Sequence, residues 1–228
     1  MAQWQFQSPY CLFVRTSVRR ERYSAFKELA GSVAYAYRQH STRAPWSAYA
    51  TVVGPSLQAF ILVPLENLQD IDSVTSMERV MVDVYGDTGR QMLAQFQDCV
   101  LEMGVSVLNR ISPASASSPQ TEPPQFLYYA NLDVRPAHVS AFVDSINGAA
   151  VLDAQNPFTL FGTFAGQTRL HGFMAGNSLA DLEAVGPIQR RFISGLASEG
   201  ETPVSTHHSD ALLASETSIL RYIGHQGA

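Results

Sequence analysis

The sequence predicts an α+β fold in which two tandem βαββαβ units form one intramolecular α/β barrel. The first observation is an internal repeat, because residues 24–26 align with residues 140–142 and residues 106–111 align with residues 218–223. The second is that both halves show the same order of strand-like and helix-like segments. The third is that the predicted strands are apolar on both faces, which is typical of a sheet covered on both sides.

The first half predicts the order strand, helix, hairpin, broken helical region and strand. Short runs of β-branched and aromatic residues indicate the strands, and apolar side chains at every third or fourth position indicate the helices. The Gly54-Pro55-Ser56 turn signal separates the hairpin strands, and we expect the helical region to break between Gly86 and Gly89. The elements span residues 10–18, 19–40, 46–53 with 59–65, 68–103 and 105–111.

The second half predicts the same order, after a Pro/Ser-rich linker at residues 112–124. Pro136 suits the first turn of the first helix, and a break in the later helical region is expected near residues 200–203. The elements span residues 126–134, 136–155, 158–165 with 170–175, 179–215 and 218–223. The linker therefore divides the chain into one unit at residues 1–111 and a second at residues 125–228.

Each unit has the ferredoxin-like, or split-βαβ, order of elements. Such a unit packs both helices on one face of a four-stranded antiparallel sheet, and the opposite face needs cover. Residues 12–14 and 126–129 are apolar without alternation, so that opposite face is apolar too. The simplest arrangement places the two sheets against each other, which gives a closed barrel with the helices outside.

The composition excludes several classes of partner. A net charge of −5 and a pI near 5.6 argue against binding to nucleic acid or to an anionic membrane. No apolar run is long enough to cross a bilayer, and residues 1–10 lack the cationic and apolar regions of a signal peptide. We therefore expect a cytoplasmic protein in which Cys11 and Cys99 are buried, reduced thiols.

The sequence lacks motifs of strong catalytic specificity. It contains no P-loop, no Rossmann glycine pattern, no nucleophile elbow and no zinc-binding pattern of histidines or cysteines. None of the six histidines has a partner at a spacing suited to a metal ion. We therefore predict no metal site and no cofactor held by a standard nucleotide motif.

Polar residues on the predicted strands are the first candidate catalytic groups. Arg15 and Asn131 occupy equivalent positions in the first strand of each half, and each follows an aromatic residue two positions earlier. Alternation places the polar and the aromatic side chain of each strand on the same face. Such a pairing is typical of a small-molecule site. The alternative is that both residues lie at strand ends and meet solvent.

His171 is the histidine that the pattern places on or beside a strand, with Arg169 on the same face. An imidazole that lines a cavity can act as a general acid or base near neutral pH. Arg169 can then hold an anionic group of the ligand. The alternative is a pair of residues at the edge of a hairpin that meets solvent.

Large aromatic side chains gather on the predicted strands. We predict that Tyr49, Tyr129, Trp46 and Phe161 line the ligand pocket, although such residues also serve as core. The two halves share their apolar frame and differ in their polar residues. A single site is therefore expected in one half, and the polar residues favour the second.

The repeat, the element order and the break in the second helical region resemble the dimeric α/β-barrel superfamily, in a form with both units on one chain. Its members include antibiotic-biosynthesis monooxygenase-like and NIPSNAP-like proteins, heme-degrading monooxygenases and the chlorite dismutase group. The resemblance implies a small-molecule enzyme that works without a cofactor. Its expected reaction is oxygenation or rearrangement of an aromatic or polyketide-like ligand. We expect a monomer with a pseudo-twofold axis or a homodimer.

Two alternatives to this function remain. One is a non-catalytic protein that binds a ligand or associates with itself. The other is a heme protein, because heme-degrading relatives pair an asparagine on the first strand with a histidine on the second helix. Asn131 and either His207 or His208 would match those roles. These relatives also use a strand tryptophan, which the second half lacks.

Overall fold

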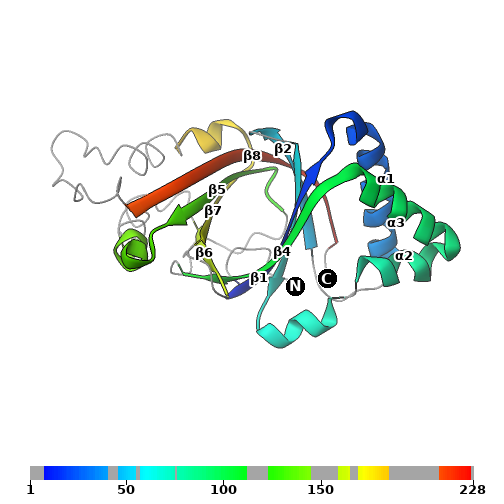
Figure 1. Ribbon diagram of the computed structural model, residues 1–228, viewed down its shortest axis with the longest axis horizontal. Helices are drawn as coiled ribbons and strands as arrows, with labels where there is room; N and C mark the ends of the chain where they lie inside the picture. The colour runs from blue at the N-terminus through cyan, green and yellow to red at the C-terminus, as the bar shows by residue number, and fades with distance from the viewer. Residues whose placement is uncertain are drawn as a thin grey trace.

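The computed structural model describes residues 8–40, 46–54, 57–74, 76–111, 123–144, 159–164, 169–184 and 211–226. Its strands form one closed barrel in the order β1-β3-β2-β8-β5-β7-β6-β4 (Figure 1). Every pair of neighbouring strands is antiparallel. The strands are β1 (Tyr10–Val18), β2 (Trp46–Val53), β3 (Gln58–Leu65), β4 (Val100–Arg110), β5 (Phe126–Val134), β6 (Thr159–Thr163), β7 (Arg169–Gly176) and β8 (Leu212–Gln226).

The helices of the first half lie outside the barrel on one side of the molecule (Figure 1). The α-helices are α1 (Tyr23–Gln39), α2 (Met77–Tyr85) and α3 (Asp87–Cys99). Short 3-10 helices are η1 (Arg20–Arg22), η2 (Leu68–Ser73), η3 (Pro136–His138) and η4 (Ala180–Ala184). The described part of the second half also begins a helix at residues 139–144, directly after η3.

The strand register confirms the predicted α+β fold of two ferredoxin-like units. Within the first half the strand order is β4-β1-β3-β2, and within the second half it is β8-β5-β7-β6. Phe13 pairs with Leu62 and Ser106. Its counterpart Tyr129 pairs with Phe173 and Ser218. The halves join where β2 pairs with β8 and β4 pairs with β6, which closes the barrel.

The barrel interior is a packed apolar core. Side chains from all eight strands meet there: Cys11, Phe13, Tyr49, Phe60, Leu62, Leu108, Leu127, Tyr129, Phe161, Phe173 and Leu220. Several of these rings lie in direct contact, and the centroids of Phe13 and Tyr129 are 5.7 Å apart across the lumen. Aromatic pairs at such distances stabilise a core beyond the area they bury.

The predicted elements agree with the structure at most strands and differ at two of them. β1, β2 and β5 have the predicted bounds, and the helical region breaks at Gly86, whose φ of 61° favours glycine. β4 begins earlier than predicted because Glu102 and Met103 pair with β1. β8 is longer because it pairs with both β2 and β5. Residues 112–122 of the predicted linker at 112–124 lie outside the described residues, as do residues 145–155 and 185–210 of the predicted helical segments. Residues 212–215, which were predicted as helical, are the first residues of β8.

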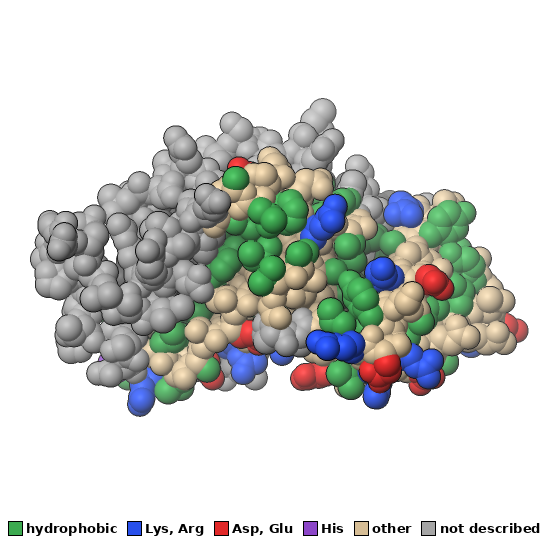
Figure 2. Space-filling view, turned by 90° about the horizontal axis from the view of Figure 1, so that it is seen from above, with side chains coloured by type: hydrophobic (Ala, Val, Ile, Leu, Met, Phe, Trp, Pro, Cys, Tyr) green, Lys and Arg blue, Asp and Glu red, His purple; other side chains and the backbone are tan. Residues whose placement is uncertain are grey.

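The outer surface exposes apolar side chains on several strands. Figure 2 shows hydrophobic side chains gathered over the middle of one face, with charged side chains more frequent toward the helices. On β2 and β8, Val53, Leu213 and Ile223 are each about half exposed. Leu101 and Val105 of β4 are more than half exposed. No helix among the described residues is long and apolar enough to cross a membrane.

Gly89 marks a close approach between α2 and α3. A Cβ atom at Gly89 would overlap with the backbone carbonyl of Met81, whereas one at Gly31 would meet nothing within 4 Å. We expect Gly89→Ala to lower the free energy of unfolding by about 2 kcal/mol, because overpacking against backbone forces a shift. Gly31→Ala is the matched control and should stabilise α1 by about 0.5–1 kcal/mol. Urea denaturation measures both, and equal effects would contradict the close approach.

Candidate functional site

A cavity of about 350 Å³ lies between α1 and the outer face of the first-half strands. We call it the α1 cavity. Its floor includes Leu12, Val14 and Thr16 of β1, which alternate with the side chains of β1 that face the barrel interior. Further lining residues come from α1, β2, β3, the start of α2, α3 and the end of β8. The predicted sheet–helix location of a pocket is therefore present, but in the first half.

Small side chains explain why this space is hollow. Ala30, Gly31 and Ala34 of α1 line the cavity from the helix side. Ala48 and Ala50 line it from β2, where alternation places both on the outer face. Alanine and glycine reach too little distance from the backbone to fill the gap between a helix and a sheet. The sequence contains this pattern of small residues, because Ala30 and Ala34 are four residues apart on the helix and Ala48 and Ala50 are two apart on the strand.

The second half is filled at the equivalent positions. The register places Leu160 where the first half has Ala48, because Tyr49 and Phe161 occupy matching positions in the two hairpins. Leu160 is fully buried in the outer core of the second half, together with Leu132, the counterpart of Thr16. The repeat therefore places bulk in the second half where it leaves space in the first. The described cavity thus lies in the first half, whereas the sequence favoured the second half, whose residues 145–158 and 185–210 lie outside the described residues.

Few polar groups face the α1 cavity. Among the described lining residues, those with a polar group in the side chain are Thr16, Tyr23, Lys27, Tyr37 and Trp46. Burial raises the pKa of Tyr37 to about 12, so its phenol stays protonated at neutral pH. The ring of Tyr37 packs edge-on against Trp46 with centroids 6.0 Å apart. The cavity is thus an apolar and aromatic space with a small number of hydrogen-bonding groups.

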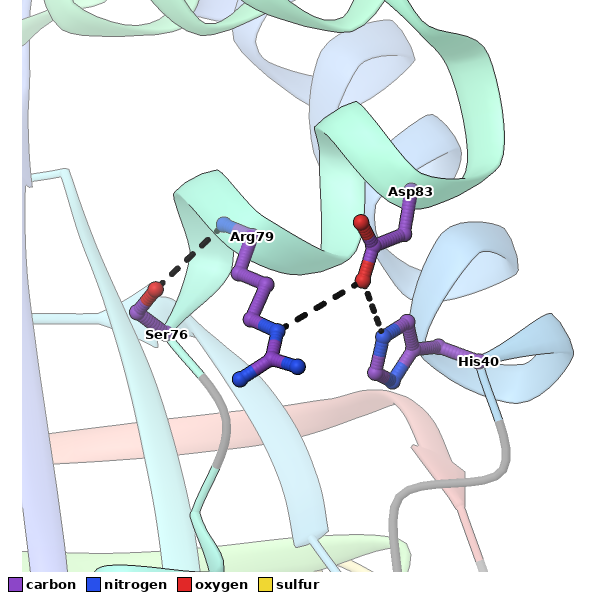
Figure 3. A network of polar contacts seen from close by, with 4 residues as sticks. All are labelled: His40, Ser76, Arg79 and Asp83. Atoms are coloured by element: carbon purple, nitrogen blue, oxygen red, sulfur yellow. Dashed lines mark hydrogen bonds and ion pairs between the residues drawn. The ribbon is translucent and has the colours of Figure 1, made fainter.

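A polar network joins the end of α1 to α2 beside this cavity (Figure 3). His40 Nε2 lies 2.9 Å from Asp83 Oδ2, and Arg79 Nε lies 3.7 Å from the same oxygen. The backbone N–H of Arg79 donates to Ser76 Oγ, which caps the first turn of α2. Met77, the next residue, lines the cavity. The network therefore fixes α2 against α1 at one border of the site.

Of the eight predicted site residues, only Trp46 lines the α1 cavity. The other seven occupy strand positions that face the barrel interior, on the opposite side of the sheet. They are Arg15, Tyr49, Tyr129, Asn131, Phe161, Arg169 and His171. The alternation that grouped them was correct. These residues share the face of the sheet that points into the lumen, whereas the α1 cavity lies against the outer face of the sheet.

Five of the residues at one end of the lumen form polar contacts. We call Arg15, Gln58, Tyr129, His171 and Glu216 the inner polar cluster. The Tyr129 hydroxyl and His171 Nδ1 are 3.0 Å apart. Arg15 Nη1 lies 3.6 Å from Glu216 Oε2 across the lumen, and Gln58 Nε2 donates to Glu216 Oε1 at 3.3 Å. Asn131 lies beside the cluster, and its buried Oδ1 has no hydrogen-bond partner.

Burial governs the ionisation of the inner polar cluster. His171 is 5% exposed, so it does not meet solvent at a hairpin edge. Burial, followed by the positive charges of Arg169 and Arg15, lowers the pKa of His171 to about 4. Burial is also the main cause that raises the pKa of Tyr129. At neutral pH the imidazole is therefore neutral, and the ring of Phe13 packs against it at 5.3 Å.

The described residues offer no ready metal centre. No group of three or more His, Cys, Asp or Glu side chains among them could hold a metal ion. Cys11 and Cys99 are buried and form no disulfide with each other. Burial raises the pKa of Cys11 to about 12, which keeps its thiol protonated. His207 and His208, the predicted heme ligands, lie outside the described residues.

Comparison with known proteins gives similarity of fold. No family model and no curated protein matches the chain. Among solved structures, a protein described as a candidate monooxygenase from Fusobacterium nucleatum is similar with a TM-score of 0.61 and 9% identity. The similarity covers 96% of this chain and 95% of that one. An anthrone oxidase-like protein is similar with a TM-score of 0.60 and 9% identity, over 97% and 94% of the two chains.

A chlorite dismutase from Candidatus Nitrospira defluvii shares the fold as well, with a TM-score of 0.54 and 9% identity. The similarity covers 96% of this chain and 95% of that one. Chlorite dismutases of this fold bind heme. The prediction that the fold implies no cofactor is therefore wrong.

The described lining of the α1 cavity offers heme no histidine or cysteine ligand. Heme iron in proteins is held by histidine, cysteine, methionine or tyrosine. The methionine and tyrosines of the described lining are Met77, Tyr23 and Tyr37, and the phenol of Tyr37 is protonated at neutral pH. Lys27 is the one cation in this lining that could meet the two propionates. The chain therefore shares its α/β-barrel fold with proteins described as monooxygenase-like and as chlorite dismutases, and the described lining of its α1 cavity is mainly apolar.

Proposed function

We propose that the protein is a monooxygenase-like enzyme that binds a flat, apolar ligand of aromatic or polyketide type in the α1 cavity. The observation that carries this proposal is the cavity, whose volume of about 350 Å³ suits a small organic molecule. Its floor of alanines and branched aliphatic side chains and its border of Tyr37 and Trp46 favour a planar ring system. The fold shared with a candidate monooxygenase and an anthrone oxidase-like protein supports the reaction class.

Anthrone illustrates the proposed chemistry. Its central CH₂ group loses both hydrogens and gains one atom of dioxygen as a carbonyl oxygen, and the second atom leaves as water. The carbon is oxidised and dioxygen is reduced, so dioxygen is the oxidant. The contribution of the cavity is to hold the ring plane, exclude water and stabilise negative charge on the substrate oxygen as the CH₂ proton leaves.

Anthrone is also the probe that tests the proposal. We expect it to quench the tryptophan fluorescence of the protein, since Trp46 lines the cavity, and we expect oxygen uptake above the rate without protein. The uptake should be measured with and without added hemin, so that a heme requirement is visible as activity only in its presence. Binding without oxygen uptake would instead favour the non-catalytic ligand-binding alternative. Absence of binding by anthrone and by other fused-ring probes would contradict the proposal.

Arg15, Asn131 and His171 were predicted as catalytic residues, and that role stays a prediction. Their position in the lumen separates them from the α1 cavity by the thickness of the sheet. The oxygen-uptake assay also tests this role. If His171→Phe or Asn131→Ala removes activity without loss of folding or of ligand binding, the reaction involves the lumen as well.

A further inference from the structure

We infer that Lys27 binds an anionic group of the ligand at the border of the α1 cavity. The inference rests on the proposed binding function and narrows its ligand class. The ligand would combine a flat apolar body with a carboxylate, phenolate or enolate oxygen. Nothing in the sequence alone pointed to this residue, because a single lysine on a helix is ordinarily a solvated surface group.

Lys27 is the only lysine of the chain, and it is the only charged residue among the described residues that line the α1 cavity. It lies on the side of α1 that carries Ala30, Gly31 and Ala34, one turn before Gly31. Its side chain is exposed, while the neighbouring Phe26 is buried. The ammonium is therefore at the border between the apolar cavity and solvent, where a charged end of a ligand would emerge.

The ammonium of Lys27 is held by a ring. Its Nζ lies 5.4 Å from the centroid of Tyr23, which also lines the cavity. In the described part of the chain the ion pairs involve Arg15, His40, Arg79 and Arg90, and none involves Lys27. The charge is thus oriented by an aromatic face and available to an anion.

The repeat gives an internal comparison for this residue. In the second half, the position equivalent to Lys27 is Val143. The repeat aligns Phe26 with Phe142, and Lys27 and Val143 are the residues that follow them. Val143 is 8% exposed and packs in the outer core of that half. The cation therefore occurs in the half with the cavity, and an apolar side chain replaces it in the half where Leu160 fills the space.

Two fluorescent probes of similar shape separate the anion contact from the apolar contact. The probes are 8-anilinonaphthalene-1-sulfonate, which carries a sulfonate, and the uncharged N-phenyl-1-naphthylamine. We expect Lys27→Met to weaken binding of the sulfonate probe about fivefold, as for a partly exposed ion pair, and to leave the uncharged probe unchanged. Lys27→Arg should restore most of the sulfonate affinity. Arg38→Met, an exposed change of equal charge on α1 outside the cavity lining, should have no effect.

The outcomes distinguish this inference from the proposed function. If neither probe binds the native protein, or if Ala48→Leu does not displace them, the α1 cavity is not a ligand site and both fail. If both probes bind in the cavity but Lys27→Met changes their affinities equally, the cavity stands and the inference is overturned. An equal loss of sulfonate binding in Lys27→Met and Arg38→Met would mean that net charge alone matters, which also overturns it.

Discussion

Ala48→Leu is expected to abolish ligand binding in the α1 cavity without unfolding the protein. The added carbons enter the hollow between β2 and α1, where the second half already accommodates Leu160 at the equivalent position. Even one extra methylene can change affinity in an apolar pocket by about 10–200-fold, so a loss of about 100-fold is expected here. Probe titration followed by fluorescence measures it, and Ala48→Ser is the control that keeps the volume.

The reciprocal change, Leu160→Ala, should lower the stability of the protein and leave ligand binding unchanged. Leu160 is fully buried in a packed cluster, so its truncation is expected to lower the free energy of unfolding by about 3 kcal/mol. It should leave binding in the α1 cavity intact. Ala48→Leu, in contrast, buries apolar surface in a space that is already present and should not lower stability. If Ala48→Leu were as destabilising as Leu160→Ala, the hollow under α1 would not exist as described.

The fold was predictable because it depends on patterns that both halves repeat. The strand at residues 10–18 and its counterpart at residues 126–134 were both assigned their bounds from local composition, and the repeat then indicated a closed barrel. The ends of β4 and β8 were not predictable. Their extra residues are strand only because partners on β1, β2 and β5 are present, and that pairing is not local.

The site was harder to predict because a cavity is defined by missing bulk. Large rings on strands, such as those of Tyr49, Tyr129 and Phe161, indicate a pocket or a core equally well, and these three belong to the buried core of the lumen. Ala48 and Ala50 attract no attention on a strand, although they create the space. The sequence signal for the cavity is the difference between Ala48 and its counterpart in the second half, the bulkier Leu160.

His171 is expected to make the folded state less stable as the pH falls below the ordinary histidine range. In the unfolded chain its pKa is near the ordinary histidine value of 6.5, and in the folded protein it is about 4. Between these values the unfolded chain binds a proton that the folded protein does not, so acid favours unfolding. The stability that this residue contributes is complete above pH 6.5 and is lost as the pH falls toward 4. The total loss is about 3 kcal/mol.

His171→Phe isolates this contribution, because the equivalent position in the first half is the buried Phe60. At pH 7.5 the variant should be somewhat less stable than the native protein, since the Tyr129 hydroxyl loses its contact with Nδ1. The difference in free energy of unfolding should then shift by about 3 kcal/mol in favour of the variant as the pH is lowered to 4. Urea denaturation at several pH values measures the shift. Other carboxylates and histidines contribute equally to both proteins, so parallel curves would mean that His171 takes up a proton in the folded state. A crossing of the curves would mean that burial and the neighbouring Arg169 and Arg15 keep His171 neutral in the folded protein as the pH falls.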